Sequence, residues 1–333
     1  MDHTLAFPLL VGLIALALAF DFLNGLHDAA NAIATVVSTR LLSPVAAVLF
    51  AAFGNFAAYW LVGLHVAETV GKGIVDKDVV TPAVVFGALI GAMFWNVVTW
   101  LKGIPSSSSH ALIGGLLGAG MAHAGLGAVQ SEGTVKTVVA IFLSPIIGFA
   151  IAMALMLLTS WLFRGLQPRG ANSMFKGLHL FSSAAYSISH GGNDAQKTMG
   201  IITVLLYSTG HLGGEFHVPE WVVLSCYAAI ALGTVSGGWK IIKTMGTGLT
   251  KLNHHTGFCA STAGSIVVFG ASAMGIPIST THAISGSVVG TGAARRASAV
   301  RWSVAGRVVI AWFITIPASG LVGALFYLLT RLF

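Results

Sequence analysis

The chain has 333 residues, of which 56% are hydrophobic and only 8% are charged. A soluble globular protein carries about 25% charged residues, so this composition excludes a cytosolic enzyme and a disordered chain. The formal net charge is +7, but no basic run resembles a nucleic-acid-binding patch, so we expect no nucleic-acid partner. These properties predict an all-α polytopic membrane protein embedded in the lipid bilayer.

Ten apolar stretches divide the chain, and most have the roughly 20 residues that one membrane crossing needs. They cover about 5–40, 45–64, 82–101, 105–125, 137–163, 177–207, 221–239, 256–273, 276–292 and 308–330. Two of them, 5–40 and 177–207, are too long for one crossing and carry polar residues in the middle. A single helix over 5–40 would be about 54 Å long, against a hydrocarbon core of about 30 Å. We therefore expect both stretches to break or to fold back.

The loops between these stretches differ in charge. With one net crossing per stretch, one side of the membrane carries only basic residues, namely Arg40, Lys102, Arg164, Arg169, Lys176, Lys240, Lys243, Lys251, Arg295, Arg296, Arg301 and Arg307. The other side is mostly acidic and carries Asp2, Glu68, Lys72, Asp76, Lys77, Asp78, Glu132, Lys136, Glu215, Glu220 and Arg331. Because cytoplasmic loops are enriched in Lys and Arg, we predict a protein of the cytoplasmic (inner) membrane with residues 164–176 inside and both termini outside.

Two motifs occur twice in the same order. The segment GIPSSSSHALIGGLLGAG at 103–120 recurs as GIPISTTHAISGSVVGTG at 275–292, and NGLHDAAN at 24–31 recurs as HGGNDAQK at 190–197. Each half carries an odd number of net crossings, so the second copy enters the membrane from the opposite side. Inverted repeats with broken or re-entrant helices at their interface are typical of secondary transporters. We predict a first repeat over 1–163, a short linker over 164–176 and a second repeat over 177–333.

The shorter motif places polar residues on one face of a helix. These are Asp21, Asn24, Asp28 and Asn31 in the first copy, and Ser187, His190, Asp194 and Lys197 in the second. A carboxylate in hydrocarbon is costly and normally faces a polar cavity or a partner. Asp194 and Lys197 could simply pair across one turn, although Asn31 stands at the place that matches Lys197. Neighbouring glycines would let both helices unwind and offer carbonyl groups to a cation.

The longer motif places a run of hydroxyls at a helix N-terminus, after Gly-Ile-Pro. The runs are Ser106, Ser107, Ser108, Ser109 and His110 in the first copy, and Ser279, Thr280, Thr281 and His282 in the second. Helix N-termini with hydroxyl donors bind anions, whereas ordinary capping needs one hydroxyl. The histidines either hydrogen-bond to a neighbour or act directly. Four facing helix ends would suit a small tetrahedral oxyanion, provided that 105–125 and 276–292 are re-entrant or half-helices.

Other functions fit these patterns less well. No ATP-binding G-x-x-x-x-G-K-[ST] motif is present. A channel or transporter for another oxyanion, such as sulfate, stays open, although fixed acids disfavour an anion-selective pore. An intramembrane hydrolase using Ser109 and His110 is disfavoured by the duplication, since one nucleophile and one base would suffice. We therefore expect a transporter and not an enzyme.

These motifs resemble those of the inorganic phosphate transporter (PiT) family over nearly the whole chain, through NGLHDAANAIATV, GIPSSSSH, SHGGNDAQK and GIPISTTH. The resemblance implies symport of inorganic phosphate with a cation, usually by a homodimer, without a covalently bound cofactor. It implies phosphate binding by Ser107, Ser108, Ser109, Ser279, Thr280 and Thr281. Coupling to the cation would involve Asn24, Asp28, Asn31, Asn193, Asp194 and Lys197, with supporting positions at Asp21, His27, Asn55, His110, His190 and His282. No dedicated metal-ligand set is assigned.

The chain departs from the sodium-coupled members, whose signature resembles G-x-N-D-x-A-N in both halves. His27 and Lys197 each replace an Asn of that signature, and an ammonium beside Asp194 would occupy the place of one Na⁺. Asn55 and Thr234 stand where sodium-type members tend to carry Glu. These features resemble the bacterial low-affinity branch, which couples to protons and can carry phosphate as a neutral divalent-metal complex. We therefore expect coupling to H⁺, through the two aspartates and next the histidines, with Na⁺ as the alternative.

Overall fold

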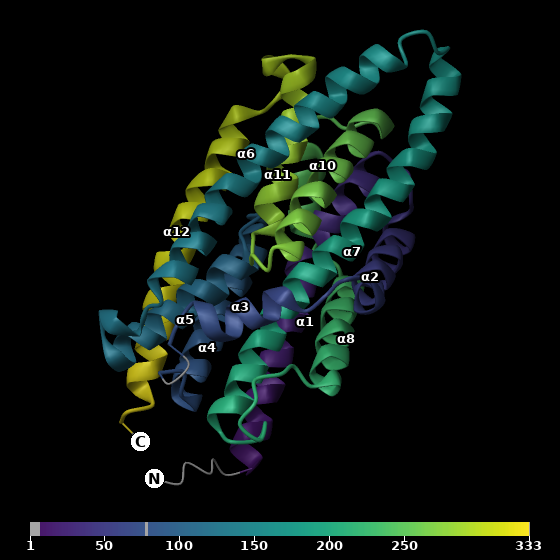
Figure 1. The fold of residues 1–333 in the computed structure, drawn as a ribbon. Coiled ribbons are helices and arrows are strands. Elements are labelled where there is room, and N and C mark those ends of the chain that lie inside the picture. The colour runs from purple at the N-terminus through teal and green to yellow at the C-terminus, as the bar shows by residue number, and fades with distance from the viewer. Residues whose placement is uncertain (1–6, 77–78, 333) are drawn as a thin grey trace.

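The computed structural model describes residues 7–76 and 79–332, and this part of the chain is a bundle of helices with no strands (Figure 1). Asp2, Lys77 and Asp78 of the charge comparison lie outside the described residues. The helices are α1 Phe7–Ser38, α2 Pro44–Leu61, α3 His65–Gly73, α4 Pro82–Lys102, α5 Ser108–Ala124, α6 Ser131–Leu162, α7 Pro168–Ser208, α8 Glu220–Ser236, α9 Trp239–Lys243, α10 His254–Ala273, α11 Thr280–Arg295 and α12 Trp302–Leu329. Short 3₁₀ turns at Leu126–Ala128 (η1) and Ala297–Ala299 (η3) and a π-helical turn at Thr244–Gly248 (η2) connect them.

Six of the described helices, α1, α2, α4, α6, α10 and α12, are long and apolar enough to cross a membrane. A seventh span is formed if α8 is joined to α9 and η2, which follow it at a bend of 66°. These helices confirm the prediction of an all-α polytopic membrane protein. By contrast, α5 and α11 have 17 and 16 residues, or about 26 and 24 Å at 1.5 Å per residue. Each packs back on the helix before it, α4 or α10, as a re-entrant hairpin would.

Helices α1 and α7 run unbroken through their polar middles, so the prediction that these stretches break or fold back is wrong. Their polar side chains are covered by neighbouring helices, which removes the need to unwind. The glycines of the motif serve close packing instead. A Cβ on Gly25 would lie 2.1 Å from the Ile230 carbonyl oxygen, and one on Gly191 would lie 2.5 Å from that of Asn55. Helix α7 also begins at Pro168, so most of the predicted linker is helical.

The two halves of the chain interlock. Helix α5 packs on α12 and α11 packs on α6, while α1 packs on α8 and α2 on α7. Glycines on matching sides of the re-entrant helices allow this contact. A Cβ on Gly118 would lie 2.0 Å from the Gly320 carbonyl oxygen, and one on Gly290 would lie 2.4 Å from that of Phe149. Each re-entrant helix is therefore held by the last helix of the other half, the arrangement expected of inverted repeats.

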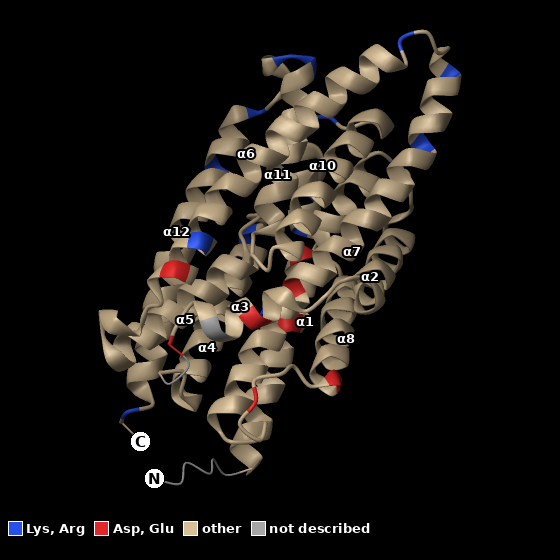
Figure 2. Cartoon of the chain, in the orientation of Figure 1, with Lys and Arg blue, Asp and Glu red and all other residues tan. Residues whose placement is uncertain are grey.

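Charged residues are distributed unevenly along the bundle (Figure 2). Most lysines and arginines lie toward the end that contains the α6–α7 connection, whereas most aspartates and glutamates lie in the half that contains both chain ends. This distribution is the one on which the predicted orientation depends. It supports the placement of the α6–α7 connection in the cytoplasm, which stays a prediction.

Candidate functional site

The two hydroxyl runs begin the two re-entrant helices. Ser107 and Ser279 are the N-cap residues of α5 and α11, and their hydroxyl oxygens accept hydrogen bonds from the backbone N–H groups of His110 (3.2 Å) and His282 (3.1 Å). The rings of His110 and His282 meet edge to face with centroids 4.2 Å apart. Two helix N-termini therefore lie together. The expectation of four facing helix ends is wrong because α1 and α7 do not break.

Capping uses one hydroxyl of each run, and three of the others contact the aspartate motifs. Thr280 Oγ1 donates to Asp194 Oδ2 at 3.0 Å, and Thr281 Oγ1 donates to Asp28 Oδ2 at 3.4 Å. Ser109 Oγ lies 2.6 Å from Lys197 Nζ, which donates to it. The buried Ser108 hydroxyl has no hydrogen-bond partner among the described residues. The structure thus brings both hydroxyl runs and both aspartate motifs to one place, with one hydroxyl left unused.

Asp28, on α1, is tied to α4 through a histidine. Its Oδ1 lies 2.7 Å from His27 Nδ1, and the other ring nitrogen of His27 lies 3.1 Å from Thr99 Oγ1. Ser106 Oγ in turn donates to Thr99 Oγ1 at 2.9 Å. We call α4 and α5 the first hairpin and α10 and α11 the second, and the residues that connect the two helices of each pair, with the first turn of the second helix, form its tip. Ser106 belongs to the tip of the first hairpin, so this chain of contacts connects Asp28 to the segment just before α5. Sequence reasoning missed Thr99, which no motif contains.

Asp194, on α7, is the most heavily bonded carboxylate of the site. It pairs with Lys197 and lies 3.2 Å from His190 Nε2. The other ring nitrogen of His190 is 3.1 Å from Asn55 Oδ1, and Asn55 Nδ2 donates to Thr234 Oγ1 at 2.9 Å. Asn55 and Thr234, each noted for its departure from the sodium-type pattern, are therefore direct partners.

The ion pair of Asp194 and Lys197 does form across one turn, but it is not the whole role of the lysine. Lys197 Nζ also donates to Ser109 Oγ and to the Ile278 carbonyl oxygen at 2.8 Å. These acceptors belong to the tips of the two different hairpins. The Ile278 carbonyl could not be found from the sequence, because a backbone oxygen carries no residue signature.

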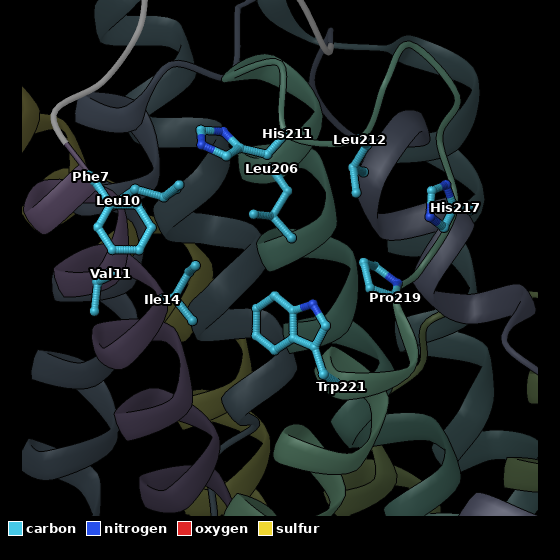
Figure 3. A pocket seen from close by; sticks show the side chains of 10 residues that line it. All are labelled: Phe7, Leu10, Val11, Ile14, Leu206, His211, Leu212, His217, Pro219 and Trp221. Carbon is cyan, nitrogen blue, oxygen red and sulfur yellow. The ribbon is translucent and has the colours of Figure 1, made fainter.

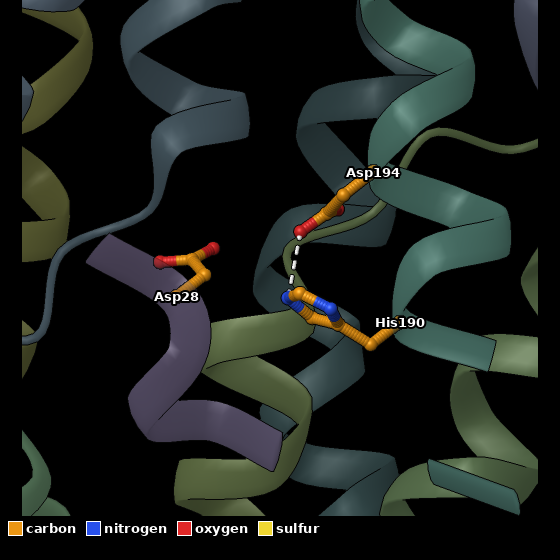
Figure 4. A group of neighbouring side chains, drawn as sticks. All are labelled: Asp28, His190 and Asp194. Carbon is orange, nitrogen blue, oxygen red and sulfur yellow. Dashed lines mark ion pairs between the residues drawn. The ribbon is translucent and has the colours of Figure 1, made fainter. Parts of the chain in front are cut away.

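Three buried side chains could hold a cation between α1 and α7. Asp28, His190 and Asp194 each offer one ligand atom, and these atoms lie within 4.8 Å of one another (Figure 4). Carboxylate oxygens suit hard cations, and an imidazole nitrogen suits transition metals. Figure 4 shows the two carboxylates pointing toward each other from the two helices, with His190 beside Asp194.

The remaining predicted residues lie around this centre. Asn193 Nδ2 donates to Ser272 Oγ at 2.9 Å and so contacts the second hairpin. Asn31 Nδ2 donates to Thr281 Oγ1 at 2.8 Å. Asp21 and Asn24 are buried further toward the N-terminus of α1. His282 also stacks on Trp312, with ring centroids 3.8 Å apart.

The site is closed to solvent. Its aspartates, hydroxyls and Lys197 are all between 0 and 3% exposed. The cavity of about 620 Å³ in Figure 3 is elsewhere, between the start of α1, the end of α7 and the residues before α8. It is lined mainly by apolar side chains, such as Phe7 and Trp221, and contains no motif residue. A second cavity, of about 460 Å³, reaches the second hairpin tip at Met274–Pro277.

Comparisons with known proteins agree with this geometry. Residues 24–323 match the model of the phosphate transporter family. The chain is 62% identical to a probable low-affinity inorganic phosphate transporter of Rhizobium meliloti (strain 1021), over 98% of each chain. It is 42% identical to a protein of the same description from Bacillus subtilis (strain 168), over 100% of this chain and 99% of the relative.

A solved structure described as the sodium-dependent phosphate transporter superposes with a TM-score of 0.88 at 26% identity. The match covers 98% of this chain and 100% of that structure. The family and these relatives are transporters, so the chain is not an enzyme, and the intramembrane hydrolase is excluded. With two interlocked halves, two re-entrant helices and the paired motifs at their meeting point, the chain belongs to the phosphate transporter family.

Proposed function

We propose that this protein imports inorganic phosphate by symport with a cation, with H⁺ as the favoured coupling ion. The observation that carries the proposal is the meeting of two helix N-termini with two buried aspartates. The anion would lie at the starts of α5 and α11, among Ser108, Ser109, Thr280 and Thr281. Ser107 and Ser279 would support it by holding the helix ends in shape, since their hydroxyls cap those helices.

The chemistry of this centre suits phosphate. Unpaired N–H groups and the positive ends of helix dipoles stabilise a small oxyanion. Hydroxyl donors add hydrogen bonds that replace part of its hydration shell. The buried hydroxyl of Ser108 has no partner among the described residues, and an unpaired buried polar group costs about 1–3 kcal/mol. A bound phosphate oxygen would remove that cost.

The aspartates explain why a cation would be required. Asp28 and Asp194 border the proposed anion position. Lys197 pairs with Asp194, but an anion brought beside the buried carboxylate of Asp28 is strongly repelled. A proton or metal ion bound at Asp28 would remove this repulsion. Phosphate would then be transported only together with its cation, which is the definition of symport. A divalent metal could also accompany phosphate as a neutral complex, held near Asp28, His190 and Asp194.

Alternating access would result if the two hairpin tips, each held closed by contacts with another helix, opened one at a time. Thr244 Oγ1 donates to the Gly103 carbonyl oxygen at 2.9 Å, and Lys240 Nζ donates to that of Leu101 at 3.2 Å, which closes the first tip on α9 and η2. Gly275 in the second tip corresponds to Gly103 in the first, since each begins a Gly-Ile-Pro motif. Gly275 lies against the His65 carbonyl group of α3. Opening one tip at a time would expose the site to one side of the membrane. We further propose a homodimer in the cytoplasmic membrane, with the repeats divided near residues 163 and 177.

The test is uptake of labelled phosphate by purified protein in liposomes, with the pH gradient and the Na⁺ gradient varied independently. We expect accumulation driven by an inward H⁺ gradient, with or without a divalent metal. No accumulation under any gradient, pH or metal condition would overturn the proposal. Accumulation driven only by Na⁺ would favour the alternative, which the likeness to a structure described as sodium-dependent supports.

A transporter for another oxyanion is the second candidate, because helix N-termini and hydroxyls also bind sulfate. Competition separates the two possibilities in the same assay. Arsenate, which shares the shape and protonation of phosphate, should compete well, and sulfate should compete poorly.

A further inference from the structure

Two residues at matching places of the two repeats make matching contacts. The offset of 166 residues that aligns the aspartate motifs pairs Asn31 with Lys197, and the offset of 172 that aligns the hydroxyl motifs pairs Ser109 with Thr281. Asn31 Nδ2 donates to Thr281 Oγ1 at 2.8 Å, and Lys197 Nζ donates to Ser109 Oγ at 2.6 Å. The same interaction is thus made twice, once by a neutral amide and once by an ammonium.

The oxygens around Lys197 are those that would otherwise coordinate a metal cation. Its ammonium contacts a carboxylate oxygen of Asp194, the Ser109 hydroxyl and the Ile278 carbonyl. Carboxylate, hydroxyl and carbonyl oxygens are the ligands of hard cations, and the three donors of the ammonium satisfy one oxygen each. The side chain is 3% exposed, so this positive charge belongs to the interior of the site.

The matching place in the first repeat has no such charge. Asp28 is bonded to His27 and Thr281, and Asn31 offers only an amide. Each aspartate has a histidine beside it, His27 for Asp28 and His190 for Asp194. Only Asp194 also has a positive side chain, on the next turn of its own helix.

We propose that Lys197 is a tethered cation, which permanently fills the second-repeat cation position of this transporter. This inference rests on the proposed symport and deepens it. Only the first-repeat position, at Asp28, Asn31 and Thr281, then takes a cation from solution during each cycle. Because the ammonium never leaves the protein, the transporter moves one cation fewer per phosphate than one with two open positions. The ammonium also adds a fixed positive charge that attracts phosphate.

Substitution of Lys197 by Asn tests this directly, since it gives the second repeat the residue found in the first. Thermal unfolding of the purified protein is measured while NaCl replaces choline chloride at constant ionic strength. Na⁺ should stabilise the Lys197→Asn variant beyond any effect on the wild type, because a ligand that binds only the folded state raises its stability. Lys197→Met, which provides neither charge nor an oxygen ligand, should show only the wild-type response.

Phosphate uptake supplies the second readout. In choline chloride, phosphate uptake by Lys197→Asn should be about tenfold lower than that of the wild type, equivalent to about 1.4 kcal/mol. NaCl should restore uptake by Lys197→Asn but not by Lys197→Met. Lys197→Gln, with the same amide on a longer stem, is measured in parallel in case the Asn variant does not fold. If Na⁺ neither stabilises the two amide variants beyond the wild type nor restores their phosphate uptake, while wild-type uptake is intact, the proposal that Lys197 is a tethered cation is overturned. Failure of the wild type to accumulate phosphate would instead overturn the proposed symport.

Discussion

The imidazole rings of His110 and His282 lie edge to face with centroids 4.2 Å apart, and this contact joins the N-terminal turns of α5 and α11. Each ring belongs to the third residue after an N-cap, Ser107 or Ser279. The two helix starts, which come from opposite halves of the chain, are thereby fixed side by side. Since helix N-termini carry partial positive charge, this contact concentrates that charge beside the two aspartates.

The first prediction separates the hydroxyls that would bind phosphate from those that cap a helix. Ser108→Ala and Thr280→Ala should each weaken phosphate affinity by about tenfold, the effect of losing one hydrogen bond to a charged group. Neither change should reduce the amount of protein in the membrane. The measurement is the concentration dependence of labelled phosphate uptake. Wild-type affinity in both variants would show that these hydroxyls do not contact phosphate.

Ser107→Ala and Ser279→Ala are the matched controls, because each removes a hydroxyl from the same run. These variants lose an N-cap, which should lower the free energy of unfolding by about 1 kcal/mol. Thermal unfolding should therefore distinguish the capping variants from Ser108→Ala, because the Ser108 hydroxyl has no hydrogen-bond partner among the described residues. Capping variants should show lower unfolding temperatures, and Ser108→Ala should not.

The duplicated motifs made much of this centre predictable. The Gly-Ile-Pro-hydroxyl pattern predicted two helix starts, and Ser107 and Ser279 are indeed N-caps. The spacing of the aspartate motif predicted that Asp28 and Asn31 share one face of α1, and both contact Thr281. Predictions from local signals of this kind hold in the folded protein, because capping and helix periodicity depend on residues that are close in the sequence.

Contacts between distant segments could not be predicted in the same way. The length of 5–40 led to the wrong expectation of a break, since the sequence does not reveal that α8 covers the glycine face of α1. Asn55 and Thr234 were each noted separately, but their hydrogen bond depends on the packing of α2 against α8. Such contacts follow from tertiary structure, which no single motif encodes.

A second prediction concerns the cost of removing Asp194. The Asp194→Asn change leaves the Lys197 ammonium buried without its carboxylate, and breaking a buried ion pair in this way costs about 3–5 kcal/mol. We expect a lower unfolding temperature and no phosphate uptake. In the double variant Asp194→Asn/Lys197→Met, the unpaired charge is gone, so the unfolding temperature should recover while uptake stays absent.

The control for this series is Glu220→Gln. Glu220 accepts a hydrogen bond from Tyr59 at 2.8 Å in an exposed position, so its substitution should change neither stability nor uptake appreciably. An Asp194→Asn variant as stable as Glu220→Gln would contradict the role of the buried pair.

A third prediction tests the contact between the two halves of the chain. A Cβ on Gly118 would lie 2.0 Å from the Gly320 carbonyl oxygen, so Gly118→Ala should push α5 away from α12. Overpacking of this kind costs about 1–3 kcal/mol. A Cβ on Gly306, in the first turns of α12, would meet no neighbouring atom within 4 Å, so Gly306→Ala should be neutral or slightly stabilising. Unfolding temperatures in detergent measure both, and equal effects would contradict the close packing.

The final prediction concerns the orientation of the chain in the membrane. Cys226 and Cys259 are free thiols buried in the structure, so they should react slowly with a membrane-impermeant maleimide. A cysteine introduced at Ser173, in the first turns of α7, should be protected in intact cells and become labelled after permeabilisation. One introduced at Gly127, in the turn after α5, should be labelled without permeabilisation, because the acidic half of the bundle is expected to face outward. The reverse pattern would invert the orientation and place both chain ends in the cytoplasm.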